Sequence, residues 1–237
     1  MLPVRFFFLL WLFLFRGAHG LAAQNELSPR QRSIVGIASL TATGDLPNLR
    51  SALIAGLNAG LTVNEAKEVL VHSYAYCGFP RSIRGLQTLM SVLEERKKQG
   101  ISDRPGKTAS VLPTHEPKYT RGKRILDSLS GRPQAGPATG YAAFSPEIDI
   151  FLKEHLFADL FERDVLSFMD RELTTISVLA GIGGVEPMLQ GHLGICFNMG
   201  LTEGQLREAF SVLEKTIGKA GADAGRAVLE QVVSTRR

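Results

Sequence analysis

Along most of the chain, apolar residues recur at spacings of three and four, which is the period of an amphipathic helix. No window alternates with the period of two that is typical of a half-buried strand. In the N-terminal part, capping signals divide this pattern into four helices, which start at Ser28-Pro29, near 47, at Thr62 and near 80. The third helix opens with a capping box that ends at Glu65, and the second ends before Gly60. The pattern therefore predicts an all-α fold.

The same signals for helix starts and helix ends occur twice along the chain. Shifting the chain by 140 residues without a gap aligns many identical pairs. They include Gly44/Gly184, Pro47/Pro187, Leu53/Leu193, Asn58/Asn198, Gly60/Gly200, Thr62/Thr202, Glu68/Glu208 and Gly85/Gly225. A second capping box, from Thr202 to Gln205, lies in the same frame as the first. The chain is therefore predicted to contain two homologous helical units.

The two units are expected at 27–98 and 146–237. The segment over 99–145 between them is rich in Gly, Pro, Ser, Thr and Lys and has few apolar residues. This composition predicts a linker that runs along the surface and adds no core of its own. The second unit begins with an extra helix over about 148–161. The wide apolar face of that helix indicates packing against the second unit or against a neighbouring subunit.

The first 23 residues have the pattern of a targeting segment. Arg5 precedes a run of apolar residues that ends at Arg16, and small residues follow. A bilayer span needs about 20 apolar residues and this run has half as many, so 1–23 is predicted to be a cleaved signal peptide and not a stable membrane span. An uncleaved interfacial anchor is the alternative. The expected location is periplasmic or extracellular. Cleavage would lower the net charge from +4 to +2, because two arginines and no acidic residue are removed.

Composition excludes several classes of protein. Hydrophobic residues make up 44% of the chain and charged residues 21%, so wholesale disorder and a multi-span membrane protein are excluded. The net charge of +4 comes without a dense basic run interleaved with aromatic residues, so no nucleic-acid partner is expected. The two cysteines, Cys77 and Cys196, allow one disulfide or two free thiols, and no Cys/His cluster suggests a zinc site.

His192 is the most suggestive single residue. It lies mid-helix after Gly191, and Cys196 follows one turn later on the same helix face. An imidazole acts as a general acid or base near neutral pH, and an imidazolium would favour a thiolate at the cysteine. A buried histidine that donates to a backbone carbonyl, beside a cysteine that fills core space, is the structural alternative. The first unit has Ala52 and Gly56 in these two frames, so only the second unit can carry the pair.

Four other residues are candidates. Glu172 follows an aspartate and an arginine at the start of a helix, where charged residues act in catalysis or complement the helix dipole. Glu68 and Glu208 occupy equivalent places in the two units, which fits a structural ion pair as well as a site. Cys77 lies where the third helix ends and the fourth begins. A helix start would stabilise its thiolate, although an inert helix-end cysteine is more common.

Five stretches of the chain, taken together, resemble a known family. They are Leu27-Ser-Pro-Arg-Gln-Arg-Ser33, Asn58-Ala-Gly-Leu-Thr62 with Glu68, Tyr76-Cys-Gly-Phe-Pro80, Arg171-Glu-Leu173 and His192-x7-Gly200-Leu-Thr202. The family is carboxymuconolactone decarboxylase, whose fold is shared with alkyl hydroperoxidase D. The resemblance covers nearly all of the expected mature chain as a tandem pair. It implies all-helical units that self-associate, often as trimers or hexamers, with sites between helices.

The resemblance leaves two kinds of chemistry open. The decarboxylase branch removes a carboxylate from a small lactone without a metal or organic cofactor. It implies that His192 is the general acid or base and that Glu172 orients it or shares in the proton transfer. The hydroperoxidase branch uses a Cys-x-x-Cys-x-x-x-His motif. Here Val185 and Met188 stand seven and four positions before His192, so that redox pair is missing.

A decarboxylase-like enzyme that acts on a small carboxylated or lactone substrate is therefore the leading hypothesis. The runner-up is a peroxiredoxin-like antioxidant that uses Cys196 or Cys77, although two free and mostly buried thiols are predicted. The third hypothesis is a non-catalytic oligomeric binding module, because loss of the histidine from one unit would also fit a scaffold.

Overall fold

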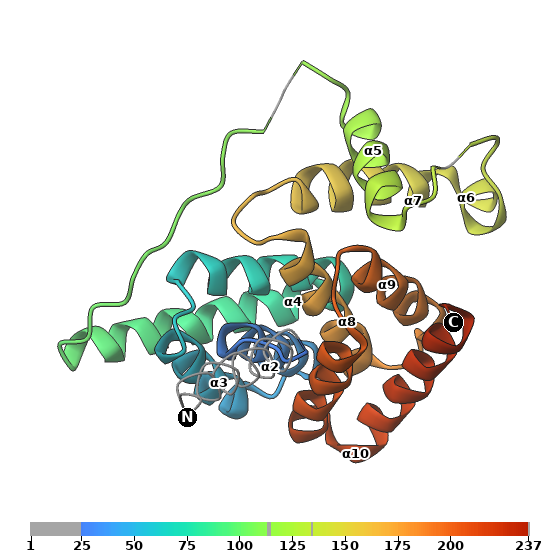
Figure 1. Cartoon of the computed structure of the whole chain (residues 1–237). Coiled ribbons are helices and arrows are strands. Elements are labelled where there is room, and N and C mark those ends of the chain that lie inside the picture. The colour runs from blue at the N-terminus through green and yellow to red at the C-terminus, as the bar shows by residue number, and fades with distance from the viewer. Residues whose placement is uncertain (1–24, 113–114, 134, 237) are drawn as a thin grey trace, which may run out of the picture.

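The computed structural model describes residues 25–112, 115–133 and 135–236, and every secondary-structure element in these ranges is a helix (Figure 1). The elements are α2 (Pro29–Thr43), α3 (Leu46–Asn58), α4 (Val63–Lys98), α5 (Lys118–Ser130), α6 (Gly140–Phe144), α7 (Pro146–Phe151), the π-helix η1 (Leu152–Phe161), α8 (Phe168–Ile182), α9 (Glu186–Asn198) and α10 (Glu203–Arg236). The all-α prediction is confirmed. The predicted signal segment lies outside the described residues. Within those residues, no helix has the length and apolar character that crossing a membrane requires.

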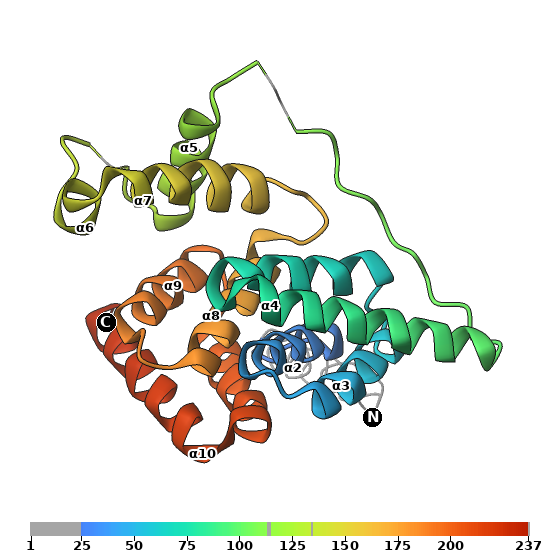
Figure 2. The ribbon, with the colours of Figure 1, turned by 180° about the vertical axis from the view of Figure 1, so that it is seen from behind.

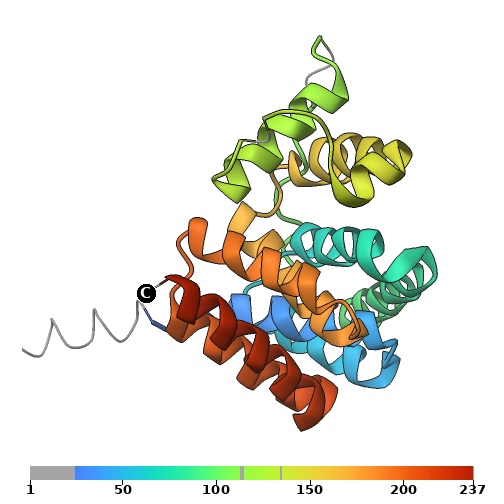
Figure 3. The same cartoon turned by 90° about the vertical axis from the view of Figure 1, so that its right-hand side faces the viewer.

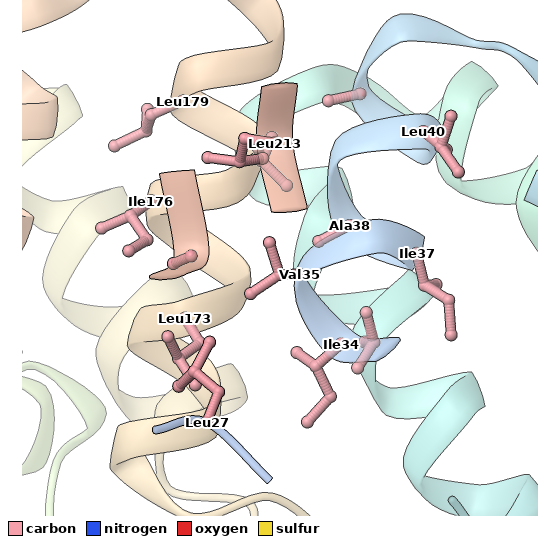
Figure 4. Close-up of a cluster of buried hydrophobic side chains, with 14 of the residues drawn as sticks. Leu27, Ile34, Val35, Ile37, Ala38, Leu40, Leu173, Ile176, Leu179 and Leu213 are labelled. Carbon is pink, nitrogen blue, oxygen red and sulfur yellow. The ribbon is translucent and has the colours of Figure 1, made fainter. Parts of the chain in front are cut away.

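Helices α2 and α8 are the first full helices of the two repeated units, and they pack against each other (Figure 4). Ser28 and Ser167 cap their N-termini, and each helix ends at a glycine with positive φ. Every residue from Ile34 to Ala42 is buried, because α3 and α4 of the same unit and α8 and α10 of the other all pack on α2. The side chain of Val35 lies on the side of α2 that faces α8 (Figure 4). The two units therefore share one hydrophobic core.

Helices α4 and α10 each consist of two arms that meet at a glycine. Gly78 and Gly218 have φ of 83° and 81°, which interrupts the helical geometry where the sequence predicted the junction of the third and fourth helices. The two arms then approach closely in each unit. A Cβ on Gly85 or on its equivalent Gly225 would lie 2.7 or 2.2 Å from a side-chain atom of the opposite arm. The glycine that both units share is therefore required by this close packing.

Two equivalent ion pairs link the units, and in each pair the arginine comes from one unit and the glutamate from the other. Arg171 of α8 donates to Glu68 of α4 at 2.8 Å, and Arg163 adds two hydrogen bonds to the same carboxylate. Arg32, which occupies the place of Arg171 in α2, donates to Glu208 of α10. The first helix of each unit thus pairs with the third helix of the other. Both glutamates therefore take part in structural ion pairs, one of the two interpretations that the sequence left open.

The expectation that 99–145 adds no core is wrong. Helix α5 packs directly against η1, and a Cβ on Gly122 would lie only 1.8 Å from the backbone oxygen of Lys153. The two helices share a second hydrophobic cluster with Ile195 of α9, which also contains Leu129, Leu156, Phe157, Leu160 and Phe161. Few apolar residues of α5 suffice, because the predicted extra helix, formed as α7 and η1, supplies most of the cluster. We call α5, α6, α7 and η1 the insert, which forms a layer over α4 and α9 (Figure 3).

Candidate active site

His192 and Glu172 form a hydrogen-bonded pair between α9 and α8. His192 Nδ1 lies 2.8 Å from Glu172 Oε2, and the glutamate side chain is completely buried whereas 15% of the His192 side chain is exposed. An ionised carboxylate only accepts hydrogen bonds, so the ring donates through Nδ1–H and keeps Nε2 for a ligand. The other carboxylate oxygen of Glu172 is also buried, and it has no hydrogen-bond partner within the described ranges.

Tyr76 of α4 lies beside this pair. Its ring is edge-on to the His192 ring, with 5.9 Å between the centroids, and its hydroxyl oxygen accepts a hydrogen bond from Thr175 Oγ1 at 3.1 Å. Burial raises the pKa of the Tyr76 phenol, and the charge of Glu172 raises it further, so the phenol stays protonated. Because α4 belongs to the first unit and α8 and α9 to the second, the site is built from both units (Figure 2).

A second histidine, His72, lies behind Tyr76 and is fully buried. Its Nε2 is 2.9 Å from Thr175 Oγ1, and its Nδ1 is 3.2 Å from Arg171 Nη1. Burial lowers the pKa of His72 well below 6.5, and the charges of Arg171 and His192 lower it further. His72 is therefore a neutral imidazole at neutral pH.

A cavity of about 930 Å³ lies in front of His192, between α4, α9 and α10 on one side and the insert on the other. Most of its walls are apolar, and its polar lining comes from Tyr76, Ser130, Arg132, Tyr141, Gln190, His192, Asn198, Thr235 and Arg236. Arg236 lies over the Phe197 ring at 5.0 Å and reaches Asn198 Oδ1 at 3.4 Å. Among the described residues that line the cavity there is no aspartate or glutamate. The cavity therefore favours an anionic ligand.

Neither cysteine lines this cavity, and both are free thiols. Cys196 is fully buried in the shared core, and this burial, together with the charge of Glu172, raises the pKa of its thiol well above the usual value. Cys77 is half-buried and donates to the carbonyl oxygen of Ser73 at 3.2 Å, and burial raises its pKa too. His192 and Cys196 are thus one turn apart on α9, but His192 lines the cavity whereas Cys196 lies in the core. The surroundings of Cys77 and of Cys196 both disfavour the thiolate that redox chemistry needs.

A family model for the carboxymuconolactone decarboxylase family matches residues 12–89 and 146–231, which is more than half of the chain. The chain belongs to the carboxymuconolactone decarboxylase family. A 4-carboxymuconolactone decarboxylase from Acinetobacter baylyi is 25% identical over 118 residues, which cover 49% of this chain and 87% of that protein. The two matched regions of this carboxymuconolactone decarboxylase family member correspond to its two units. Helices α5 and α6 lie between the matches.

A tandem member of the carboxymuconolactone decarboxylase family contains two places for a site of this kind. We call the residues around the cavity the retained half-site, and the equivalent positions of the other unit the counterpart half-site. Alignment of the helix caps and of the 140-residue repeat pairs Glu172 with Ser33, Thr175 with Gly36, His192 with Ala52, His72 with Val212 and Tyr76 with Thr216. No ionisable side chain stands at any of these five counterpart positions.

The sequence singled out His192 and Glu172 but gave Tyr76, Thr175 and His72 no role. One signal was available. Tyr76 stands in a stretch that resembles the carboxymuconolactone decarboxylase family, two residues before the helix break at Gly78. The contact of Thr175 with Tyr76 and His72 could not be found in this way, because it joins helices 99 and 103 residues apart in the chain.

The structure offers no resident metal site among the residues that it describes. No group of three or more His, Cys, Asp and Glu side chains in this part of the chain is placed to hold a metal ion.

Proposed function

We propose that this protein is a decarboxylase-like enzyme that acts by acid/base chemistry on a small carboxylated or lactone substrate in the cavity at His192. The observation that carries the proposal is the pairing of a completely buried Glu172 with a His192 that faces a cavity. The lining of that cavity includes Arg132 and Arg236 and, in the described residues, no carboxylate. The similarity to a protein named 4-carboxymuconolactone decarboxylase supports a carboxylated lactone as the substrate class.

The proposed reaction uses His192 as a proton carrier. Glu172 holds the ring through Nδ1–H, which leaves Nε2 directed to the ligand. When the bond between the carboxylate and its carbon breaks, CO₂ leaves and the electron pair stays on the substrate carbon, where an adjacent carbonyl delocalises it. Protonated Nε2 of His192 then delivers a proton to that carbon, and the ring takes up a new proton from solvent. This step consumes one proton, releases one CO₂ and requires no organic cofactor.

Replacement of the histidine tests this proposal. His192→Ala is expected to lower kcat for CO₂ release from 4-carboxymuconolactone by about 10²–10⁴-fold, the usual contribution of a positioned general acid or base. His155→Ala is the matched control, because His155 is exposed on η1, pairs with Asp159 and does not line the cavity. Equal turnover by wild type and His192→Ala would contradict the proposal.

The two other hypotheses predict different results. A peroxidase would lose peroxide turnover on Cys196→Ala or Cys77→Ala, and the raised pKa of both thiols speaks against it. A binding module would show stabilisation by small carboxylic acids that depends on His192, without any turnover. A thermal-shift screen followed by a CO₂ assay separates the enzyme from the module.

Export and self-association belong to the same proposal. The second arm of α4 exposes Phe79, Ile83 and Met90, whose side chains recur at helical spacing and supply an apolar face for a second subunit. A sedimentation mass above that of one chain is expected, in the range of a trimer or hexamer. Detection of the mature protein outside the cytoplasm, with an N-terminus near residue 21 or 24, would support the predicted signal peptide.

A further inference from the structure

A chain of hydrogen bonds runs through the buried interior and ends at Tyr76. It starts at Arg171 Nη1, which is 3.2 Å from His72 Nδ1. It continues from His72 Nε2 to Thr175 Oγ1 over 2.9 Å and from Thr175 Oγ1 to the Tyr76 hydroxyl over 3.1 Å. The decarboxylase-like mechanism through His192 and Glu172 leaves this chain without a role.

Arg171 fixes the direction of every bond in this chain. A guanidinium can only donate, so Nδ1 of His72 accepts. A neutral imidazole then carries its one proton on Nε2, and that N–H donates to Thr175 Oγ1. The threonine hydroxyl therefore uses its own proton to donate to the Tyr76 oxygen, in agreement with the geometry of that contact. The lone pair of Tyr76 that faces Thr175 is thus occupied, and the phenolic proton must point elsewhere.

The cavity is the place that the phenolic proton can reach. Tyr76 lines the cavity beside His192, and the described part of the chain offers its hydroxyl no acceptor. Tyr76 is only partly exposed, and a hydroxyl that lacks an acceptor in such a place costs free energy, which a ligand oxygen in the cavity would recover. Glu68 fixes the position of Arg171, where this series of hydrogen bonds starts, because it accepts a hydrogen bond from Arg171 Nη2 at 2.8 Å.

We propose that Tyr76 is a further catalytic residue, which donates its phenolic proton in a hydrogen bond to the substrate oxygen that gains negative charge as the carboxylate leaves. His72, Thr175 and Arg171 are positioning residues that set the orientation of this donor. The proposal rests on the proposed function and adds a second group to it. His192 delivers a proton to the substrate carbon, and Tyr76 donates a hydrogen bond to the substrate oxygen. A preoriented donor of this kind stabilises the transition state more than the bound substrate.

Tyr76→Phe removes the donor and keeps the ring. We expect kcat for 4-carboxymuconolactone to fall about 10²–10³-fold, with a much smaller change in KM. Tyr74→Phe is the matched control on the same helix, because Tyr74 stacks on Phe79 and does not line the cavity. A second readout without chemistry is calorimetric binding of muconate, an open-chain dicarboxylate, which Tyr76→Phe is expected to weaken about tenfold.

Thr175 separates a positioning role from a merely structural one. Thr175→Val keeps the shape but breaks the chain, and it is expected to lower kcat about tenfold with KM unchanged, whereas Thr175→Ser is expected to restore most of the rate. Variants that lose activity only in proportion to a lower thermal midpoint would point to a structural role and overturn the proposal.

The possible failures are distinguishable. If wild type releases CO₂ and Tyr76→Phe matches it in both turnover and muconate binding, the role of Tyr76 is wrong and the proposed function stands. If wild type neither releases CO₂ nor binds muconate, the proposed function fails and the role of Tyr76 fails with it.

Discussion

The retained half-site and the counterpart half-site have equivalent backbones but different chemistry. Both units keep the serine cap, the glycine break and the exchanged ion pair, yet only the retained half-site has ionisable groups, at four of its five positions. In the counterpart, Thr216 accepts a hydrogen bond from Ser39 at 2.9 Å. The insert follows the same division, because α5 contacts α9 and has no comparable contact with α3.

The cost of burying polar groups explains why the two half-sites differ. Glu172 is completely buried with one oxygen unpaired, which lowers the stability of the fold. His72 is held neutral by burial, and both of its ring nitrogens need partners from other residues. Ser33, Gly36 and Ala52 carry no such cost. The proposed role of Glu172 and His72 at the cavity would account for their presence in one unit only, whereas both units contain the scaffold residues because the fold needs them.

The largest expected effect comes from breaking the His192–Glu172 pair. Glu172→Gln replaces an acceptor by an amide that can present its N–H₂ group to Nδ1, which releases the ring from its orientation and its tautomer. Turnover should fall by about 10²–10⁴-fold. Ser33→Ala, at the equivalent position of α2, should leave turnover unchanged. Comparable losses in both variants would mean that the counterpart half-site also takes part in the reaction.

The two exchanged ion pairs are expected to differ in stability. Glu68→Ala leaves the completely buried Arg171 without its carboxylate, which should lower the free energy of unfolding by about 3–5 kcal/mol. Glu208→Ala should cost only about 1 kcal/mol, because Arg32 is about a third exposed and water replaces its partner. Urea unfolding followed by circular dichroism measures both. Equal losses of unfolding free energy would show that the two ion pairs contribute equally to stability in spite of their different burial.

His72 should make the stability of the protein depend on pH. Its folded-state pKa lies well below 6.5, so below pH 6.5 the unfolded chain binds a proton that the folded chain does not. The free energy of unfolding should therefore fall as pH drops from 6.5 to 5, by at most about 1.4 kcal/mol per pH unit.

The variant His72→Gln isolates this contribution. Glutamine can still accept from Arg171 and donate to Thr175 but does not titrate, so its stability should change less over the same pH range. The equivalent residue of the other unit is Val212, which contributes no proton uptake. An unchanged pH slope in His72→Gln would place the proton uptake at another group.

The smallest expected effect concerns the thiols. In the native protein, a thiol reagent such as an aromatic disulfide should react slowly with Cys77 and reach Cys196 only on unfolding, because Cys196 is fully buried. Cys196→Ala should leave turnover unchanged and cost about 1 kcal/mol of stability for the lost sulfur. The counterpart position, Gly56, is already smaller. Rapid native labelling of Cys196 would contradict the environment described for it.

The sequence was sufficient for most of the fold. Helical periodicity, the two capping boxes and the glycine pairs predicted the class, the duplication and the main helix junctions. Helix α5 was missed, because its 13 residues contain few apolar positions and its partner η1 follows more than twenty residues later. A contact between two weakly patterned segments is not visible in either segment alone.

The candidate site could be predicted only in part. His192 and Glu172 carry a recognisable spacing within one unit, whereas Tyr76 and His72 come from the other unit and reach the site through the packing of α4 on α8. The i, i+4 relation of His192 and Cys196 suggested a shared environment. The structure places one at the cavity and the other in the core, because a helix at a cavity edge has a cavity side and a core side within one turn.

The burial of α2 on all sides has a consequence for synthesis on the ribosome. The first unit emerges with the stretch from Ile34 to Ala42 lacking its main cover, because α8 and α10 are still to be made. More than 120 further residues must be translated before Leu173 and Leu213 can close over it. The nascent first half is therefore expected to remain loosely folded and to depend on chaperones, and full compaction follows only when the last helix has left the exit tunnel.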